Sequence, residues 1–90
     1  MPLQILSTPS APAELAPELE RVISEALPDA SVEVRATSPG HFEIAVVSAS
    51  FEGQSRVVQQ QRVYAAIAPL MQGDAAPVHA IDRLQTSTPG

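Results

Sequence analysis

Between residues 13 and 27, hydrophobic side chains recur every three or four positions, the spacing of a helix with one buried stripe. Pro17 fits best in a first turn, so we expect the stable part of this helix to begin near Ala16 or Pro17. Pro28 cannot continue the helix and marks its end. The expected buried stripe is Leu15, Leu19, Val22, Ile23, Ala26 and Leu27.

Two segments with strand-like alternation follow, residues 31–35 and 41–48. The second segment places Phe42, Ile44 and Val46 on one face. The five residues between the two segments are rich in turn-forming types, so we expect an antiparallel hairpin.

A second helical pattern covers residues 55–71, after a turn at residues 50–53. Pro69 removes one backbone hydrogen bond, so we expect it to bend or restart this helix before residues 73–74 end it. The expected buried face is Val57, Tyr64, Ile67, Ala68 and Met71, and the polar positions are Arg56, Gln59, Gln60 and Arg62.

A third strand is expected at residues 78–84, where the alternation is ambiguous because Val78, Ala80 and Leu84 oppose His79 and Ile81. The predicted order is helix, strand, strand, helix, strand. Prolines crowd the start of the chain, so residues 1–11 are expected to form a flexible tail, with a short extended piece folded back as the alternative. The expected domain is 12–86, followed by a tail at 87–90.

The composition limits both the core and the chemistry. Ninety residues make one small domain, and with only 3% aromatic residues its core must consist of Val, Ile, Leu and Ala. The absence of Cys and Lys excludes disulfides, a catalytic thiol, thiolate zinc sites and Schiff-base chemistry. A net charge of −5 argues against phosphate-driven nucleic-acid binding. Without a long apolar run or a signal peptide pattern, we expect a soluble cytoplasmic protein.

No sequence motif indicates catalysis. The chain lacks HExxH, GxSxG and a phosphate-binding glycine loop, and its glutamates at residues 14–25 are most simply a solvated helix face, so we expect no enzyme. The two histidines, His41 and His79, each lie at or near the start of a predicted strand. Neutral imidazole is a good metal ligand, and the alternative is a polar strand-end residue bonded to backbone.

Four segments resemble the BolA-like family when taken together: GHFEIAVVS at 40–48, FEG at 51–53, RVVQQQRVY at 56–64 and VHAI at 78–81. They occur in the family's order and at its separations, and the resemblance runs from about Leu15 to Thr86. It implies an α+β domain of the α-β-β-α-β type, with a three-stranded mixed sheet, helices packed on one face, and a layout like that of a type II KH domain.

The resemblance also implies a function. BolA-like proteins pair with monothiol glutaredoxins and share a [2Fe–2S] cluster with them, in iron–sulfur trafficking, iron homeostasis and stress response. The family's strand-three ligand falls on His79. The family's second ligand is a Cys or His in the loop between the first two strands, but residues 35–40 offer neither, and His41 is the nearest substitute. The short loop and Gln61, where many members have His, indicate the short-loop branch.

The composition constrains this mechanism independently. A [2Fe–2S] cluster needs four donors, usually thiolates, and this chain has no thiolate and two imidazoles. We therefore expect the isolated chain to bind no cluster, with the remaining donors coming from the partner and its glutathione. Histidine ligation is expected to raise the reduction potential relative to all-thiolate clusters.

Three arginines are candidate partner-binding residues, Arg56, Arg62 and Arg83; isolated surface arginines are the alternative. The chain itself is expected to be a monomer or a weak homodimer, without membrane contact. Two other functions stay open: a transcriptional or nucleic-acid-binding regulator using the KH-like region, against which the charge weighs, and a protein-interaction module that needs no cluster.

Overall fold

The computed structural model describes residues 12–73 and 76–90. The expected tail at residues 1–11 lies outside these described residues. In chain order, the described elements are α1 (Pro12–Ala26), β1 (Ser31–Ser38), β2 (His41–Val47), the 3-10 helix η1 (Ala49–Phe51), α2 (Arg56–Met71) and β3 (Ala80–Ser87).

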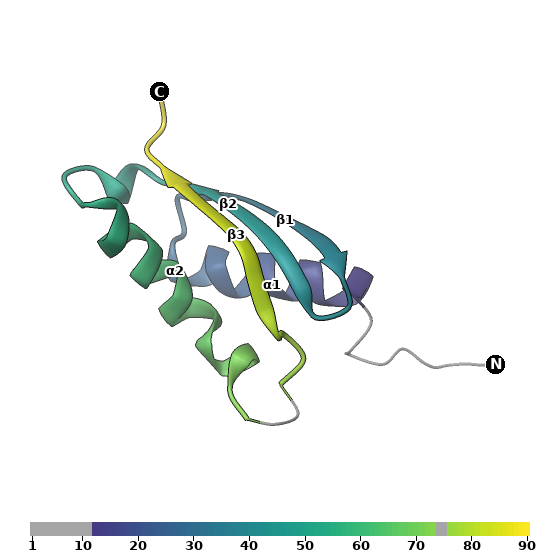
Figure 1. Cartoon of the computed structure of the whole chain (residues 1–90). Helices are drawn as coiled ribbons and strands as arrows, with labels where there is room; N and C mark the ends of the chain where they lie inside the picture. The colour runs from purple at the N-terminus through teal and green to yellow at the C-terminus, as the bar shows by residue number, and fades with distance from the viewer. Residues whose placement is uncertain (1–11, 74–75) are drawn as a thin grey trace.

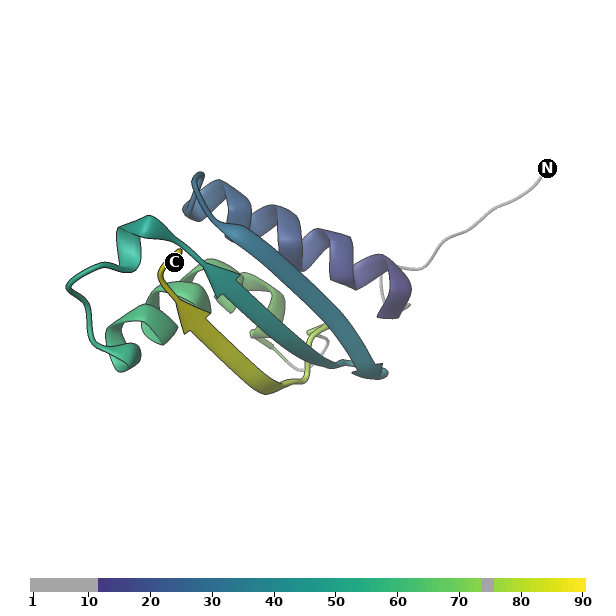
Figure 2. The same ribbon diagram turned by 90° about the horizontal axis from the view of Figure 1, so that it is seen from above.

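The three strands form one mixed sheet in the order β1-β2-β3. Strand β1 pairs with β2 antiparallel, and β2 pairs with β3 in parallel after the chain has crossed over through α2. Both helices lie on the same side of this sheet (Figure 1), and the view from above shows α1 alongside β1 (Figure 2). The α+β prediction, with its mixed sheet and helices on one face, is therefore confirmed.

The core lies between the sheet and the two helices. Alternate residues of β2 point into it, and Phe42, Ile44 and Val46 are at most 2% exposed. Burial of each such side chain contributes roughly 1.5–3 kcal/mol relative to leaving it in water. The facing residues of α1 are Leu15, Leu19 and Ile23.

The start of α1 differs from the expectation. The helix begins at Pro12, so Pro17 lies inside it rather than in its first turn. Leu15 is buried at 3% exposure in the turn before Pro17. This packing holds the earlier turn in the helix although Pro17 has no backbone N–H to donate.

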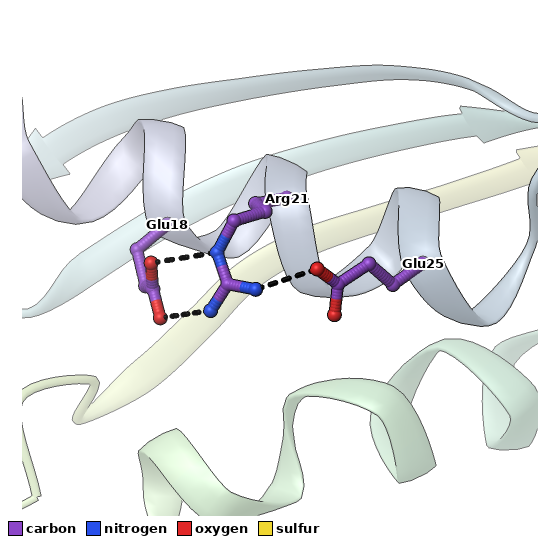
Figure 3. Close-up of polar contacts among 3 residues, drawn as sticks. All are labelled: Glu18, Arg21 and Glu25. Carbon is purple, nitrogen blue, oxygen red and sulfur yellow. Dashed lines mark hydrogen bonds and ion pairs between the residues drawn. The ribbon is translucent and has the colours of Figure 1, made fainter.

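The outer face of α1 carries an ion-pair chain (Figure 3). The guanidinium of Arg21 donates to both carboxylate oxygens of Glu18, at 3.1 and 2.7 Å, and to Glu25 at 2.7 Å. The hydrogen bond from Arg21 holds the pKa of Glu18 below its usual value. Glu18 and Glu25 thus form a solvated, paired part of this helix surface.

The β1–β2 connection is shorter than expected. Strand β1 continues to Ser38, so only Pro39 and Gly40 form the turn, and Gly40 has a φ of 79° that favours glycine. Ala36 still pairs with Phe42, which is why the turn-forming composition of residues 36–40 does not end the strand.

The buried face of α2 also differs from the expectation. Val63 and Ile67 are its buried residues, whereas Val57 and Tyr64 are 62% and 41% exposed. The helix turns this face inward because two polar residues, Gln59 and Gln60, are half-buried and use their amides to bind backbone carbonyls. The helix continues through Pro69 to Met71 without a restart.

Strand β3 is displaced toward the C-terminus relative to the predicted 78–84. It extends to Ser87, so residues 85–87, which follow the predicted strand, also belong to the sheet. A register shift explains the ambiguous alternation: Phe42 pairs with Ile81 and Glu43 with Arg83, which leaves Asp82 as an extra residue. Ile81 and Leu84 therefore both pack against the core.

An acidic side chain fixes the start of η1. Asp29 accepts hydrogen bonds from the hydroxyl of Ser48, at 2.9 Å to Oδ1, and from the backbone N–H of Ala49, at 2.9 Å. Ser48 is fully buried. These bonds, chiefly the one from Ser48, lower the pKa of Asp29.

No helix in the described part of the chain is long and apolar enough to cross a membrane.

Candidate functional site

The turn after β1 brings the two histidines together. The carbonyl of Gly40 accepts hydrogen bonds from the backbone N–H groups of His79, at 2.8 Å, and Ala80, at 3.0 Å. This contact ties the start of β3 to the turn directly before His41. The two histidines, 38 positions apart in the sequence, thus lie at the same end of the sheet.

The two imidazoles are neighbours. Their ring centroids are 6.5 Å apart, and the ring planes are nearly perpendicular at 86°. His79 is exposed and His41 is partly exposed, so both rings are accessible from outside. The pair thus places two side chains of a metal-binding type next to each other.

The ring of His79 packs on a glycine. A Cβ built on Gly40 would lie 2.6 Å from Nδ1, 2.8 Å from Cγ and 3.1 Å from Cε1 of His79. Since these are the three nearest atoms, Nε2 of His79 lies farther from this Cβ position. Gly40 is therefore needed for its positive φ and for the space that His79 occupies.

A carboxylate that the sequence analysis did not single out completes this end of the sheet. Asp82 Oδ1 lies 3.0 Å from Nδ1 of His41, and the hydroxyl of Thr37 donates to Asp82 Oδ2 at 3.0 Å. These two hydrogen bonds, with the His41 bond the larger cause, lower the pKa of Asp82. The sequence feature that could have indicated Asp82 is the broken alternation of residues 78–84, because it marks the extra residue in β3.

The donors at this site are few. Within residues 12–73 and 76–90, no three His, Asp or Glu side chains come together in a group that would hold a metal ion. Two imidazoles supply at most two of the four donors of a [2Fe–2S] cluster. The two imidazoles alone therefore do not complete the ligand set of such a cluster.

The candidate arginines are not gathered at the histidines. Arg56 is exposed at the first position of α2, and Arg83 lies on β3 opposite Glu43. Arg62 is engaged inside the chain: its Nη1 donates to the carbonyl of Ser50 and to Gln54, both at 3.0 Å. Its guanidinium also lies 5.5 Å from the centre of the Phe51 ring.

An open depression of about 600 Å³ is lined by residues of all three strands and by Glu20 of α1. Charged side chains of both signs line it, and Arg35 donates to Glu43 at 3.2 Å within it. Arg83 and Gln85 line its other side. Because charges of both signs line it, the depression has no single preference for an anion or a cation.

The fold of this chain matches that of known proteins. A family model described as BolA-like protein matches residues 12–90. The chain belongs to the BolA-like family. A comparison with curated proteins returned no match.

Solved structures of other BolA-like proteins superpose on this chain. A bolA protein homologue from Coxiella burnetii is 32% identical, with a TM-score of 0.66 over 80% of this chain and 87% of that one. A bol-like protein from Babesia bovis is 28% identical, with a TM-score of 0.70 over 83% and 85%. BolA1 from Mus musculus is 29% identical, with a TM-score of 0.68 over 99% and 77%.

Proposed function

We propose that this BolA-like chain is a non-enzymatic adaptor that pairs with a monothiol glutaredoxin and co-ligates a bridged [2Fe–2S] cluster. His79 is the first ligand from this chain and His41 the second. The observation that carries the proposal is the pair itself: two accessible imidazoles, 6.5 Å apart, at one end of the sheet.

The donor chemistry supports a shared cluster. Imidazole is an accepted ligand on one iron of a [2Fe–2S] centre, whereas the remaining positions take thiolates. This chain has no cysteine, so those thiolates belong to the glutaredoxin and its glutathione. Thiolates stay reduced in the cytoplasm, which is where we place this function.

In this proposal the cluster is cargo. Replacing thiolate by imidazole raises the reduction potential of a [2Fe–2S] centre, since imidazole adds no negative charge. In this proposal the cluster shared with the adaptor therefore has a higher reduction potential than the cluster of the glutaredoxin alone. This difference suits a role in cluster trafficking or iron homeostasis.

The placement of the arginines supports a protein partner over a nucleic acid. Arg21, Arg35 and Arg62 all donate to glutamates, a glutamine or a carbonyl within the chain. Phosphate-driven binding needs free, clustered cations. Salt-dependent binding of DNA or RNA by the isolated chain would favour the regulator function instead.

The test is an anaerobic reconstitution with a monothiol glutaredoxin, glutathione, iron and sulfide, followed by visible absorption and circular dichroism. We expect the wild type to give a spectrum distinct from that of the glutaredoxin alone. His79→Ala should remove this difference, and His41→Ala should reduce it. The control is Gln85→Ala, an exposed residue of β3 itself. If His79→Ala gives the wild-type spectrum, the cluster function is wrong and the cluster-independent module becomes the better explanation.

A further inference from the structure

Both edge strands carry one extra residue at the same level of the sheet. In β1 the pairing passes from Ala36–Phe42 to Ser38–His41, which leaves Thr37 without a partner in β2. In β3 it passes from Ile81 to Arg83, which leaves Asp82 without one. A bulge of this kind redirects a side chain, and the two bulges lie opposite the His41–Phe42 and Phe42–Glu43 steps of β2.

The two extra residues contact each other, and one of them, Asp82, contacts His41. Asp82 Oδ1 is 3.0 Å from Nδ1 of His41, and Thr37 donates its hydroxyl hydrogen to Asp82 Oδ2 at 3.0 Å. Thr37 thus occupies one carboxylate oxygen and orients the other toward the imidazole. The three side chains come from β1, β2 and β3, so the whole width of the sheet defines the geometry.

This contact decides which nitrogen of His41 has a free lone pair. An ionised carboxylate only accepts hydrogen bonds, so the hydrogen between the two residues belongs to Nδ1 of His41. In neutral His41 the lone pair is then on Nε2. Metal-binding histidines in proteins are oriented in the same way, with the second nitrogen donating to a carboxylate.

We infer that Asp82, oriented by Thr37, is a positioning residue that holds His41 in the Nδ1–H tautomer and presents Nε2 as the metal-binding atom. The role of that atom as a cluster ligand rests on the proposed function. The tautomer itself does not, because it is a property of the isolated chain. The inference therefore has its own readout.

The first experiment is ¹⁵N NMR of the histidine side chains in the full, metal-free chain at a pH where both are neutral. We expect His41 to be predominantly the Nδ1–H tautomer in the wild type. Asp82→Asn keeps the shape but supplies an N–H donor to Nδ1, and should move His41 toward the Nε2–H tautomer. Thr37→Val should produce a smaller shift in the same direction, and Asp82→Glu should restore part of the Nδ1–H population. His79 serves as the internal control because its tautomer should not follow these changes.

The second experiment repeats the reconstitution with Asp82→Asn. Loss of a carboxylate partner of a metal-binding histidine typically lowers metal affinity by about ten- to hundredfold, so we expect a cluster that is lost correspondingly faster to a chelator.

A wild-type His41 in the Nε2–H form, or a tautomer unchanged in both Asp82→Asn and Thr37→Val, would overturn the inference. If the tautomer changes but His41→Ala leaves the cluster spectrum unaltered, the positioning stands and the ligand role of His41 fails.

Discussion

The imidazole of His79 lies against the backbone of Gly40, so closely that a single added Cβ would stand 2.6 Å from its Nδ1. Two backbone hydrogen bonds to the carbonyl of Gly40 hold the chain on both sides of this contact. Gly40 is therefore part of the histidine site, although it offers no side chain. Substituting Gly40 should lower stability in two ways, through the positive φ of this residue and through the space that His79 occupies.

In Gly40→Ala, the added Cβ should strain the backbone, which has a positive φ, and should clash with the ring of His79. The positive φ alone costs about 1–2 kcal/mol for a residue with a side chain, and overpacking adds about 1–3 kcal/mol. We expect a lower free energy of unfolding in urea and displaced NMR signals of the His79 ring.

The matched control for this substitution is Gly53→Ala. Gly53 has nearly the same φ, 78°, but nothing lies within 4 Å of its added Cβ. Gly53→Ala should therefore lower the free energy of unfolding only by the cost of the positive φ, and it should leave the NMR signals of His79 in place. Equal losses in the two variants, with His79 unmoved in both, would show that the contact has no energetic weight.

Asp29 should make stability depend on pH in the acid range. Its pKa is lowered in the folded chain by the bond from Ser48, so its contribution is present above the unfolded value of about 3.8 and is lost as the pH falls through the folded value. Asp29→Asn should therefore be less stable than the wild type near pH 7, and the gap should close as the medium becomes more acidic than pH 4. Urea denaturation at several pH values measures this.

Glu20→Gln is the control for that series, since it removes the same charge from an exposed position of α1. It should leave stability near pH 7 almost unchanged. A constant gap between Asp29→Asn and the wild type at every pH would contradict a role for the ionised carboxylate.

The orientation of α2 is tested by one buried and one exposed residue. Ile67→Ala should cost about 2–5 kcal/mol, because Ile67 is fully buried against the core. Val57→Ala should change stability by less than about 0.5 kcal/mol, since Val57 is 62% exposed. Thermal and urea unfolding of both variants measures the difference. If both variants lose a similar amount of unfolding free energy, Val57 is buried, as the sequence pattern predicted.

That error in the predicted face has a physical cause. Their hydropathy predicts that Gln59 and Gln60 face the solvent, but each side chain has an apolar stem and an amide that can donate a hydrogen bond. The amide of Gln59 donates to the backbone carbonyl of Gln54, and that of Gln60 to the carbonyl of Leu84. Such a residue is stable half-buried once its donor is satisfied. Periodicity of apolar residues alone does not report this, whereas β2, with clean alternation, was predicted correctly.

The site was predictable only in part for a similar reason. His41 and His79 stood out by type and by their places in the family pattern, and the crossover topology explains why they meet. Thr37 and Asp82 did not stand out, because a bulge is a relation between two strands. A strand's own sequence shows only that its alternation breaks.

The last prediction concerns Arg62, which the sequence placed among the candidate partner-binding residues. Its two hydrogen bonds, to the Ser50 carbonyl and to Gln54, and its place over Phe51 tie α2 to the segment after β2. Arg62→Ala should therefore cost about 1–2 kcal/mol in unfolding free energy and speed amide exchange in residues 49–55. Arg56→Ala, at an exposed position of the same helix, should leave both unchanged. Calorimetric titration with a monothiol glutaredoxin then tests the interface. If Arg56→Ala binds the glutaredoxin more weakly but is as stable as the wild type, Arg56 belongs to the interface. If Arg62→Ala is as stable as the wild type, the structural role of Arg62 is wrong.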